Sequence, residues 1–368
     1  MKSMSKKTDY NYVNYALNLT RKTVGSTSSN PTVACVIVKN NIIISTGVTA
    51  KSGRPHAEQI AISKITNKEA LLDAEIYVTL EPCAHFGQTS PCVDEIIKCG
   101  FKRVIIATKD PDKRVNGLGI AKLQEAGIEV TCGILEKESQ EVNRAFFKAR
   151  QTGLPFVTLK LATSLDGKIA TKNGNSKWIT SEKSRLFSHH LRSINDAILV
   201  GANTVRKDNP SLDCRISGLE DFSPKRIILS NKLNLDPESK IFQNCSKIPT
   251  IILSKNNNSE FRIPSAQIIF CKEKNGLIDL QNALEKLCEA GINSVLVEGG
   301  QNVATQFLQE NLVDELIWIR SGKIIGNDGI AAIGDLNFAK ISDVFDGMIK
   351  TETRVLESDV IEIYRKRI

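Results

Sequence analysis

Four side chains in the first third of the chain can act together only if three separate segments meet, and this requirement constrains the fold more than any other feature. They are His56 and Glu58, and two cysteines that each follow a proline, Cys83 and Cys92. Imidazole and thiolate are ligands that zinc favours, and a catalytic zinc site keeps a fourth position open for water. His56, Cys83 and Cys92 are therefore candidate metal ligands, and Glu58 is a carboxylate beside them that need not bind the ion.

This order, His-x-Glu followed by Pro-Cys and a second Cys, resembles the zinc-dependent base deaminases. In those enzymes an activated water attacks a ring carbon that bears an amino group, and a glutamate transfers the protons. The resemblance implies one zinc ion per chain and a catalytic role for Glu58. Two alternatives stay open. The cysteines could be ordinary buried thiols, or the zinc could be structural, with His85 as its fourth ligand.

Length and composition set broad limits. A chain of 368 residues is longer than one core usually fills, which predicts about two domains. The net charge of +8 is spread along the chain and suits an anionic substrate or a nucleotide cofactor. Nine cysteines without compact spacing indicate reduced thiols. Because neither a signal-peptide pattern nor a run of about 18 apolar residues is present, the sequence predicts a cytoplasmic protein.

Short apolar runs alternate with helical patterns in the first half of the chain. The runs predict strands over 32–39, 42–45, 74–80, 103–108 and 128–131. Apolar residues at helical spacing predict helices over 10–21, 56–65, 92–99, 120–126 and 137–150. This alternation is typical of a mostly parallel sheet with helices on both faces. It places His56 and Cys92 at helix starts, where positive partial charge favours thiolate over thiol.

A turn at residues 152–155 predicts a boundary between domains over 8–150 and 154–368. The second half again alternates, which predicts another α/β domain. Strands are expected over 156–162, 198–201, 226–229, 250–253, 294–298 and 316–320, and a helix over 303–310.

Eight residues, A-H-F-G-Q-T-S-P, separate Cys83 from Cys92, whereas nucleic-acid and nucleoside deaminases typically have Pro-Cys-x-x-Cys. This insert resembles the loop of the pyrimidine deaminases of riboflavin biosynthesis. So do the segment 30–36 and Asp110-Pro111 with the later Val115-x-Gly117-x-Gly119. The resemblance implies a cytidine-deaminase-like three-layer α/β/α fold. It also implies a substrate site formed by Asn30, His85, Asp110 and Asp112.

One departure from that family concerns the substrate's phosphate. The family commonly has Lys or Arg where this chain has Gln88, and Gln88 can donate only neutral hydrogen bonds. We therefore expect weaker phosphate binding, or a contribution from another basic residue.

Four segments of the second half, 160–170, 176–180, 197–215 and 297–300, resemble the reductase domain of the same bifunctional family. That domain has a dihydrofolate-reductase-like fold. The resemblance implies an NADPH site lined by Ala162, Trp178, Thr204, Asp208, Gly300, Gln301, Asn302, Val303, Ala304, Thr305 and Gln306. It implies a substrate site lined by Lys160, Ser176, Arg192, Leu212, Arg215 and Glu298.

Some of these positions have a physical interpretation of their own. A strand that ends in Gly299-Gly300 before a helix lets backbone amides approach a cofactor phosphate, although such pairs also occur in tight turns. Arg192 and Arg215 suit bidentate phosphate binding, although surface ion pairs would use the same residues. No G-x-G-x-x-G follows the first strand, so NADPH binding does not rest on that fingerprint. His189 and His190 are adjacent on a predicted helix and are expected at the surface.

The resemblance thus predicts a bifunctional enzyme of riboflavin biosynthesis. The first domain would hydrolyse the 2-amino group of 2,5-diamino-6-(5-phosphoribosylamino)pyrimidin-4-one, and the second would use NADPH to reduce the ribosyl group to ribityl. The expected partners are a phosphorylated pyrimidine and a further copy of the chain in a homo-oligomer, with neither nucleic acid nor membrane. The alternatives are a nucleic-acid or nucleoside base deaminase with an accessory domain and a non-enzymatic protein with structural zinc.

Overall fold

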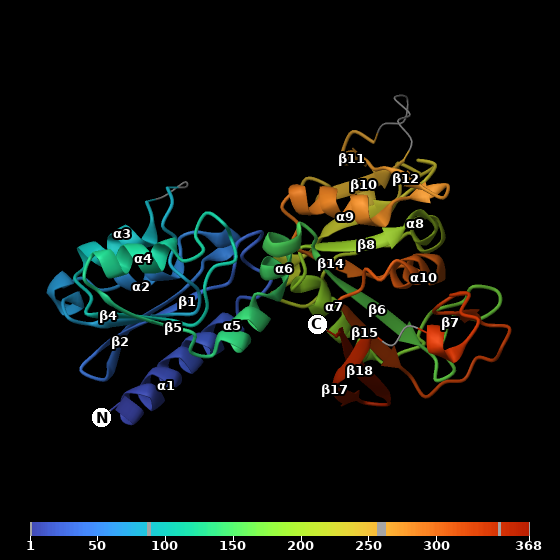
Figure 1. Ribbon diagram of the computed structural model, residues 1–368. Coiled ribbons are helices and arrows are strands. Elements are labelled where there is room, and N and C mark those ends of the chain that lie inside the picture. The colour runs from blue at the N-terminus through green and yellow to red at the C-terminus, as the bar shows by residue number, and fades with distance from the viewer. Residues whose placement is uncertain (1, 87–89, 256–262, 345–346, 368) are drawn as a thin grey trace. The chain divides into compact units, whose positions relative to one another are not determined.

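The chain forms two compact units, Met1–Gly153 and Leu154–Ile368 (Figure 1). The structure is a computed structural model that describes residues 2–86, 90–255, 263–344 and 347–367. Gln88 lies outside these ranges. Among the helices that they contain, none is both long enough and apolar enough to cross a bilayer.

The first unit contains a five-stranded sheet in the order β2-β1-β3-β4-β5. The strands are β1 (Ala34–Lys39), β2 (Ile42–Val48), β3 (Glu75–Val78), β4 (Arg103–Ile106) and β5 (Glu129–Cys132). β1 is antiparallel to both β2 and β3, whereas β3, β4 and β5 are parallel. The expectation of a mostly parallel sheet is therefore wrong here. A tight turn at Asn40 and Asn41, both with positive φ, folds β2 back on β1 as a hairpin at the sheet edge.

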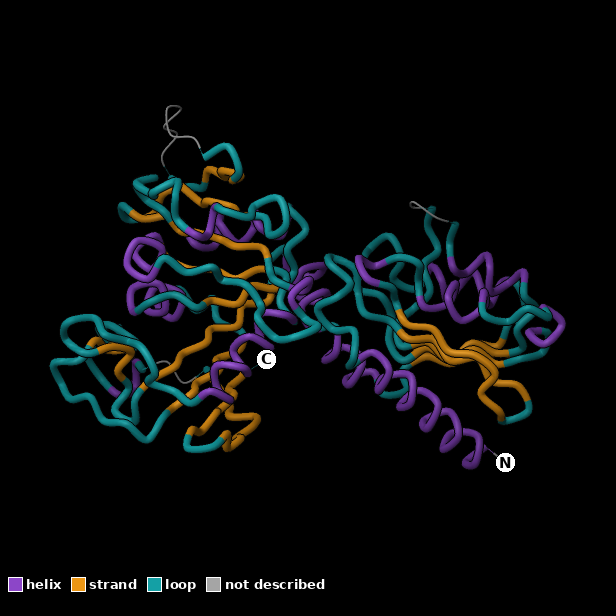
Figure 2. The backbone as a smooth tube through the Cα atoms, turned by 180° about the vertical axis from the view of Figure 1, so that it is seen from behind, coloured by secondary structure: helices purple, strands orange, loops and turns teal. Residues whose placement is uncertain are grey.

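Helices cover both faces of this sheet (Figure 2). They are α1 (Lys2–Thr20), α2 (Ala57–Ser63), α3 (Cys92–Lys98), α4 (Leu118–Glu125), α5 (Glu136–Val142) and α6 (Arg144–Thr152). One core lies between the sheet and α2, α3 and α4, and a second lies between the opposite face and α1 with α5. The unit therefore has the three layers that were expected.

The helix expected over 137–150 is interrupted at Asn143, which separates α5 from α6. The Oδ1 atom of Asn143 accepts a hydrogen bond from the Thr32 N–H at 2.8 Å, and its Nδ2 atom donates to the Thr32 carbonyl at 3.0 Å. These two bonds clamp the loop that precedes β1. Sequence periodicity cannot reveal this break, because the partner is 111 residues away.

The second unit contains a nine-stranded sheet in the order β11-β10-β9-β8-β14-β6-β15-β18-β17. The strands are β6 (Phe156–Thr163), β8 (Ala197–Gly201), β9 (Lys225–Leu229), β10 (Thr250–Ser254), β11 (Ala266–Phe270), β14 (Ser294–Val297), β15 (Glu315–Arg320), β17 (Met348–Leu356) and β18 (Asp359–Lys366). Pairing is parallel from β11 to β15 and antiparallel from β15 through β18 to β17. Small pairs form between β7 (Lys168–Ala170) and β16 (Ile330–Ala331) and between β12 (Glu273–Lys274) and β13 (Leu277–Ile278).

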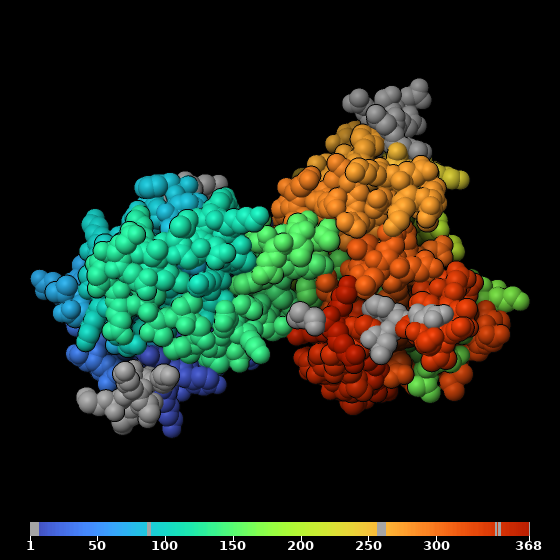
Figure 3. Space-filling model, viewed as in Figure 1, coloured from blue at the N-terminus to red at the C-terminus, as the bar shows by residue number. Residues whose placement is uncertain are grey.

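Four helices flank this larger sheet: α7 (Glu182–Ser193), α8 (Ala202–Asp208), α9 (Leu280–Glu289) and α10 (Gln301–Gln309). α9 and α10 pack on one face, and α7 and α8 pack on the other. In the space-filling view orange atoms, the colour of the segment that includes α9 and α10, lie on the near side of the upper part of this unit (Figure 3). Ligands of α/β sheets bind beyond the carboxyl ends of the parallel strands, so those ends are where a site is expected.

Candidate active sites of the two units

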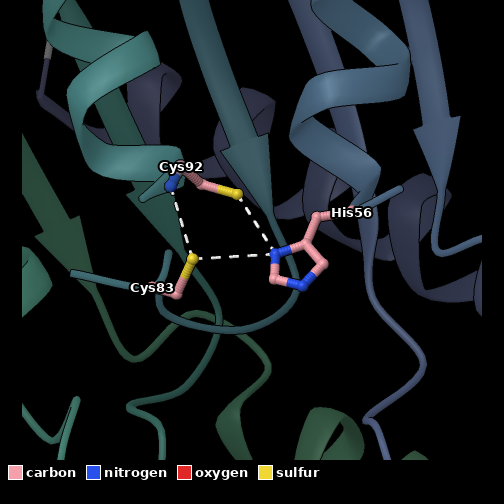
Figure 4. Close-up of side chains that lie close together, drawn as sticks. All are labelled: His56, Cys83 and Cys92. Carbon is pink, nitrogen blue, oxygen red and sulfur yellow. Dashed lines mark hydrogen bonds between the residues drawn. The ribbon is translucent and has the colours of Figure 1, made fainter. Parts of the chain in front are cut away.

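The first unit brings His56, Cys83 and Cys92 together (Figure 4). His56 is the N-terminal capping residue of α2, Cys83 lies in the loop after β3, and Cys92 is the first residue of α3. Their ligand atoms all lie within 4.8 Å of one another. The His56 Nδ1 atom is 3.2 Å from the Cys92 Sγ atom and 3.6 Å from the Cys83 Sγ atom.

These distances fit a shared metal ion. Tetrahedral zinc with typical Zn–N and Zn–S bonds holds its nitrogen and sulfur ligands about 3.6 Å apart. The Cys92 N–H donates a hydrogen bond to the Cys83 Sγ atom at 3.3 Å. Hydrogen bonding from the Cys92 side chain lowers the pKa of Cys83 to about 4, so that Cys83 is a thiolate at neutral pH. Three ligands of this chemistry fit zinc and leave one position for water.

Glu58 lies in the first turn of α2 and is only 4% exposed. Burial, with a further contribution from the negative charge of Cys83, raises the pKa of Glu58 to about 7. A carboxyl group with this pKa can both accept and release a proton at neutral pH. The position of Glu58 beside the ligands thus suits the proton-transfer role expected from the sequence.

Glu81 lies two residues before Cys83 and holds a neighbouring loop in place, although it was not among the site residues predicted from the sequence. Its side chain is buried and accepts three backbone N–H bonds: Oε2 from Asp110 at 3.2 Å and Gly117 at 2.9 Å, and Oε1 from Ile120 at 3.2 Å. Gly119 lies against the same segment, since a Cβ atom there would be 2.4 Å from the Pro82 carbonyl oxygen. Glu81 therefore fastens the 110–120 loop to the loop that carries Cys83.

The expected substrate residues of the first unit have distinct surroundings. A Cβ atom on Gly53 would be 2.1 Å from the Asn30 Nδ2 atom, so a glycine is needed beside Asn30. The buried Nδ1 atom of His85 makes no hydrogen bond within the described part of the chain. Burial raises the pKa of Asp110 to about 6, whereas hydrogen bonding from Arg114 lowers the pKa of Asp112 to about 2. Asp110 and Asp112 therefore differ in protonation behaviour although both were expected at the substrate.

In the second unit the expected cofactor residues lie at the carboxyl ends of adjacent strands. Ala162 is near the end of β6, Thr204 and Asp208 are on α8 after β8, and Gly300 to Gln306 follow β14. β14 lies between β6 and β8, so these ends form one edge. A Cβ atom on Gly299 would be 2.5 Å from the Val303 Cβ atom, whereas one on Gly300 would meet nothing within 4 Å. The open start of α10 fits a phosphate of NADPH.

Trp178 is 63% exposed, and its backbone has a positive φ of 65°. The Arg185 guanidinium lies 4.3 Å from its ring centroid, and the Lys323 ammonium donates to its carbonyl oxygen. The expected substrate residue Ser176 is also exposed, in the same loop between β7 and α7. These contacts hold an aromatic ring at the surface, where a cofactor or substrate can reach it.

Glu298, Arg192 and Lys160 form a buried charged cluster where β14 ends. Arg192 donates from Nε to Glu298 Oε1 at 2.9 Å and from Nη2 to Oε2 at 3.1 Å, and Lys160 Nζ lies 3.4 Å from Oε2. Burial alone would raise the pKa of Glu298, but the charges of Arg192 and Lys160 outweigh it and lower that pKa to about 2. Glu298 is therefore a permanent anion at neutral pH.

The loop over residues 211–215 is held from two sides. Arg226, which is fully buried, donates to the Ser211 carbonyl at 3.4 Å, and Arg192 Nη1 donates to the Asp213 carbonyl at 3.0 Å. Leu212 is buried with a positive φ of 53°. The loop thus has a defined conformation that presents the side chain of the next expected residue, Arg215.

His190 is exposed as expected, but His189 is not a free surface residue. It is half-buried, with its Nδ1 atom 3.1 Å from the Asp213 carbonyl and its Nε2 atom 3.2 Å from Arg215 Nη2. The sequence could have indicated that His189 lies beside the substrate site, because it stands three residues before Arg192 and both therefore lie on one face of α7.

Two family models match the chain. The "cytidine and deoxycytidylate deaminase zinc-binding region" matches residues 6–108, and the "RibD C-terminal domain" matches residues 155–361. The riboflavin biosynthesis protein RibD of Aquifex aeolicus is 40% identical over 366 residues, which cover 99% of this chain and 100% of that protein. RibD of Bacillus amyloliquefaciens is 38% identical and covers 97% of this chain and 99% of that protein.

The chain belongs to the RibD family. Solved RibD structures agree: that of Acinetobacter baumannii superposes with a TM-score of 0.91 at 32% identity, over 99% of this chain and 100% of the other. A deaminase/reductase from Thermotoga maritima gives 0.87 at 34% identity, with the same coverage.

The expected family, fold class and bifunctional activity are therefore confirmed. This chain is an enzyme of riboflavin biosynthesis that combines a deaminase unit with a reductase unit, and its cofactors are zinc and NADPH. A nucleic-acid deaminase with an unrelated accessory domain does not account for the match to the RibD C-terminal domain.

Proposed function

We propose that residues 8–150 deaminate 2,5-diamino-6-(5-phosphoribosylamino)pyrimidin-4-one and that residues 154–368 reduce the product. The observation that carries the first half is the convergence of His56, Cys83 and Cys92 beside the buried Glu58. The deaminase/reductase from Thermotoga maritima, which bears the names of both reactions, supports the choice of substrate.

In the first reaction, water replaces the 2-amino group and ammonia leaves. His56, Cys83 and Cys92 would hold a zinc ion, which would make a nucleophilic water available because coordination lowers the pKa of water to about 7. Glu58 would accept one proton as the water attacks and give it to the neighbouring ring nitrogen, and it would then take the second proton from the new hydroxyl group and pass it to the amine, so that ammonia leaves as the carbonyl forms. Its pKa of about 7 suits both directions of transfer.

The remaining residues of this unit bind and orient the pyrimidine. The Nδ1 atom of His85, which has no hydrogen-bond partner among the residues that the structure describes, and the amide of Asn30 would offer hydrogen bonds to the ring and ribose. Asp110 and Asp112 lie on the loop that Glu81 fastens. Since Gln88 carries no charge, we expect a basic residue elsewhere to hold the phosphate or the phosphate to bind more weakly. An unchanged substrate affinity in Gln88→Lys would contradict this expectation.

In the second reaction, NADPH held by this unit would supply a hydride to C1′ of the sugar; the bond between C1′ and the ring oxygen would break, and that oxygen would take up a proton to give the open ribityl chain. We propose that Ala162, Trp178, Thr204, Asp208 and residues 300–306 bind NADPH. Ser176, Leu212 and Arg215 contact the substrate, and Lys160 lies beside the ribose. The chain's task in this reaction is positioning. Arg192 and Glu298 complete the site, and their mutual hydrogen bonds leave Arg215 as the more accessible cation.

Several broader properties belong to the same proposal. A cytoplasmic location suits nine cysteines that are all free thiols in the structure. A small phosphorylated pyrimidine, rather than nucleic acid or a membrane, is the proposed ligand. We also propose a homo-oligomer, which light scattering of the purified protein would test.

The first test is ammonia release from zinc-loaded protein and the diamino-pyrimidinone phosphate without NADPH. Stoichiometric ammonia is expected, and Glu58→Gln should abolish it while zinc content and NADPH oxidation with the deaminated substrate persist. Retained ammonia release in Glu58→Gln would refute the role of Glu58. No release from the zinc-loaded wild-type protein would refute the proposed substrate.

A further inference from the structure

His189 links two parts of the proposed reductase substrate site. It lies on α7, one turn before Arg192, and faces the 211–215 loop. Its Nδ1 atom is 3.1 Å from the Asp213 carbonyl oxygen, and its Nε2 atom is 3.2 Å from Arg215 Nη2. The imidazole therefore bridges a fixed backbone carbonyl and a guanidinium group.

The guanidinium of Arg215 decides the tautomer of the ring, because Nη2 can only donate and Nε2 must then offer its lone pair. In a neutral ring the hydrogen is then on Nδ1, which donates it to the Asp213 carbonyl oxygen. The backbone N–H of Arg215 also lies 3.2 Å from Nδ1, so His189 contacts the backbone of the loop as well as the arginine side chain. Burial and the charges of Arg192 and Arg215 lower the pKa of His189, which is consistent with a neutral ring.

The two arginines of this site are used differently. Arg192 is 13% exposed, and its Nε, Nη1 and Nη2 atoms all donate to Glu298 or to the Asp213 carbonyl. Arg215 is 62% exposed, and its side chain also forms an ion pair with Asp213 at 3.3 Å. An exposed pair of that kind fixes a side chain only weakly. Arg215 is thus the cation that can turn toward a phosphate, and His189 is the half-buried group that can direct it.

We infer that His189 is a positioning residue of the reductase site that orients the Arg215 guanidinium toward the phosphate of the substrate. The inference rests on the proposed function, which places Arg215 at that phosphate. An arginine side chain loses much rotamer freedom when it is fixed, and fixing it before the substrate arrives reduces the cost of binding. His189 therefore acts on substrate affinity and not on hydride transfer.

Two substitutions separate the two ring nitrogens. In His189→Asn the side-chain amide lies near the position of Nδ1, and the acceptor for Arg215 is lost. In His189→Gln an amide oxygen can reach the position of Nε2. We expect His189→Asn to raise the KM for 5-amino-6-(5-phosphoribosylamino)uracil about three- to tenfold, the worth of one hydrogen bond. The kcat should stay within about twofold, and His189→Gln should recover most of the lost affinity.

The chain supplies two controls. His190→Asn changes the adjacent, exposed residue of the same helix and should leave the reductase KM unchanged. Ammonia release by the deaminase unit should be unchanged in every variant, since a general folding defect would not spare it. If His189→Asn lowers kcat instead of raising KM, or if His189→Gln is no better than His189→Asn, the inference is wrong.

Arg215→Gln separates failure of the inference from failure of the proposed function. If Arg215→Gln raises KM and adding His189→Asn raises it no further, His189 acts through Arg215 as inferred. Independent, additive effects would overturn the inference and leave Arg215 at the phosphate. An unchanged KM in Arg215→Gln would overturn the placement of Arg215, and the inference would fall with it.

Discussion

Glu81→Gln tests whether a buried carboxylate holds the substrate loop of the deaminase unit. In the wild-type structure the two carboxylate oxygens accept N–H bonds from Asp110, Gly117 and Ile120. Glutamine keeps the shape of the side chain but replaces one oxygen with an NH2 group. The best orientation keeps the oxygen toward Asp110 and Gly117, so that the NH2 group faces the N–H of Ile120.

The free-energy cost of Glu81→Gln follows from these three hydrogen bonds. Loss of the bond to Ile120, which leaves two donors facing each other, costs about 1–3 kcal/mol. The other two bonds change from charge-assisted to neutral and lose roughly half their strength, about 1 kcal/mol each. The total is about 3–5 kcal/mol, which should open the 110–120 loop on the order of a hundred- to several thousandfold more often.

Hydrogen–deuterium exchange of the peptide that spans this loop measures the opening directly. We expect faster exchange there, a higher KM for the diamino-pyrimidinone phosphate and unchanged NADPH oxidation by the reductase unit. Glu125→Gln, on the exposed side of α4, is the matched control and should change none of these. Unchanged exchange in a Glu81→Gln protein that still binds zinc would refute the reasoning, because the three N–H groups would then not depend on the charge.

Two further predictions concern buried carboxyl groups. Burial raises the pKa of Asp110 from 3.8 to about 6, so the folded state keeps a proton that the unfolded state releases. The deaminase unit should therefore lose stability as pH rises from about 4 to 6, by at most about 3 kcal/mol, and Asp110→Asn should remove this loss in urea unfolding at the two pH values. In the second unit, Glu298→Gln leaves the buried charges of Arg192 and Lys160 without their anion and should destabilise that unit by about 3–5 kcal/mol. Urea unfolding of this unit, monitored by the loss of NADPH oxidation, measures the change in stability. A variant as stable as wild type would show that water screens the two cations.

The metal ligands were predictable from the sequence because their chemistry is specific. An imidazole and two thiols after prolines have few other uses in combination, and the elements that carry them were found by periodicity to within a few residues. The expected helix over 56–65 is observed as Ala57–Ser63, with His56 as its cap. The strand expected over 103–108 is observed as Arg103–Ile106.

Residues that act through long-range hydrogen bonds were not predictable in the same way. Asn143 interrupts a helical pattern because its amide clamps Thr32, and Glu81 reaches N–H groups about thirty to forty residues further along the chain. The spacing of His189 from Arg192 places both residues on one face of a helix, but it does not reveal the contact with the 211–215 loop, which gives His189 its role. Local pattern carries no record of such partners, so these roles emerge only once the fold brings the segments together.

The two buried glutamates, Glu58 and Glu298, show why the environment and not the residue type decides a role. Both are largely inaccessible to water, and burial raises the pKa of each. For Glu58, no positive charge is strong enough to offset the rise in pKa that burial causes, and the resulting pKa of about 7 allows Glu58 to carry protons. Arg192 and Lys160 outweigh burial for Glu298, and its pKa of about 2 forbids proton transfer near neutral pH. Glu298 is therefore an electrostatic anchor for two cations, and any proton that the reductase reaction requires must come from another group.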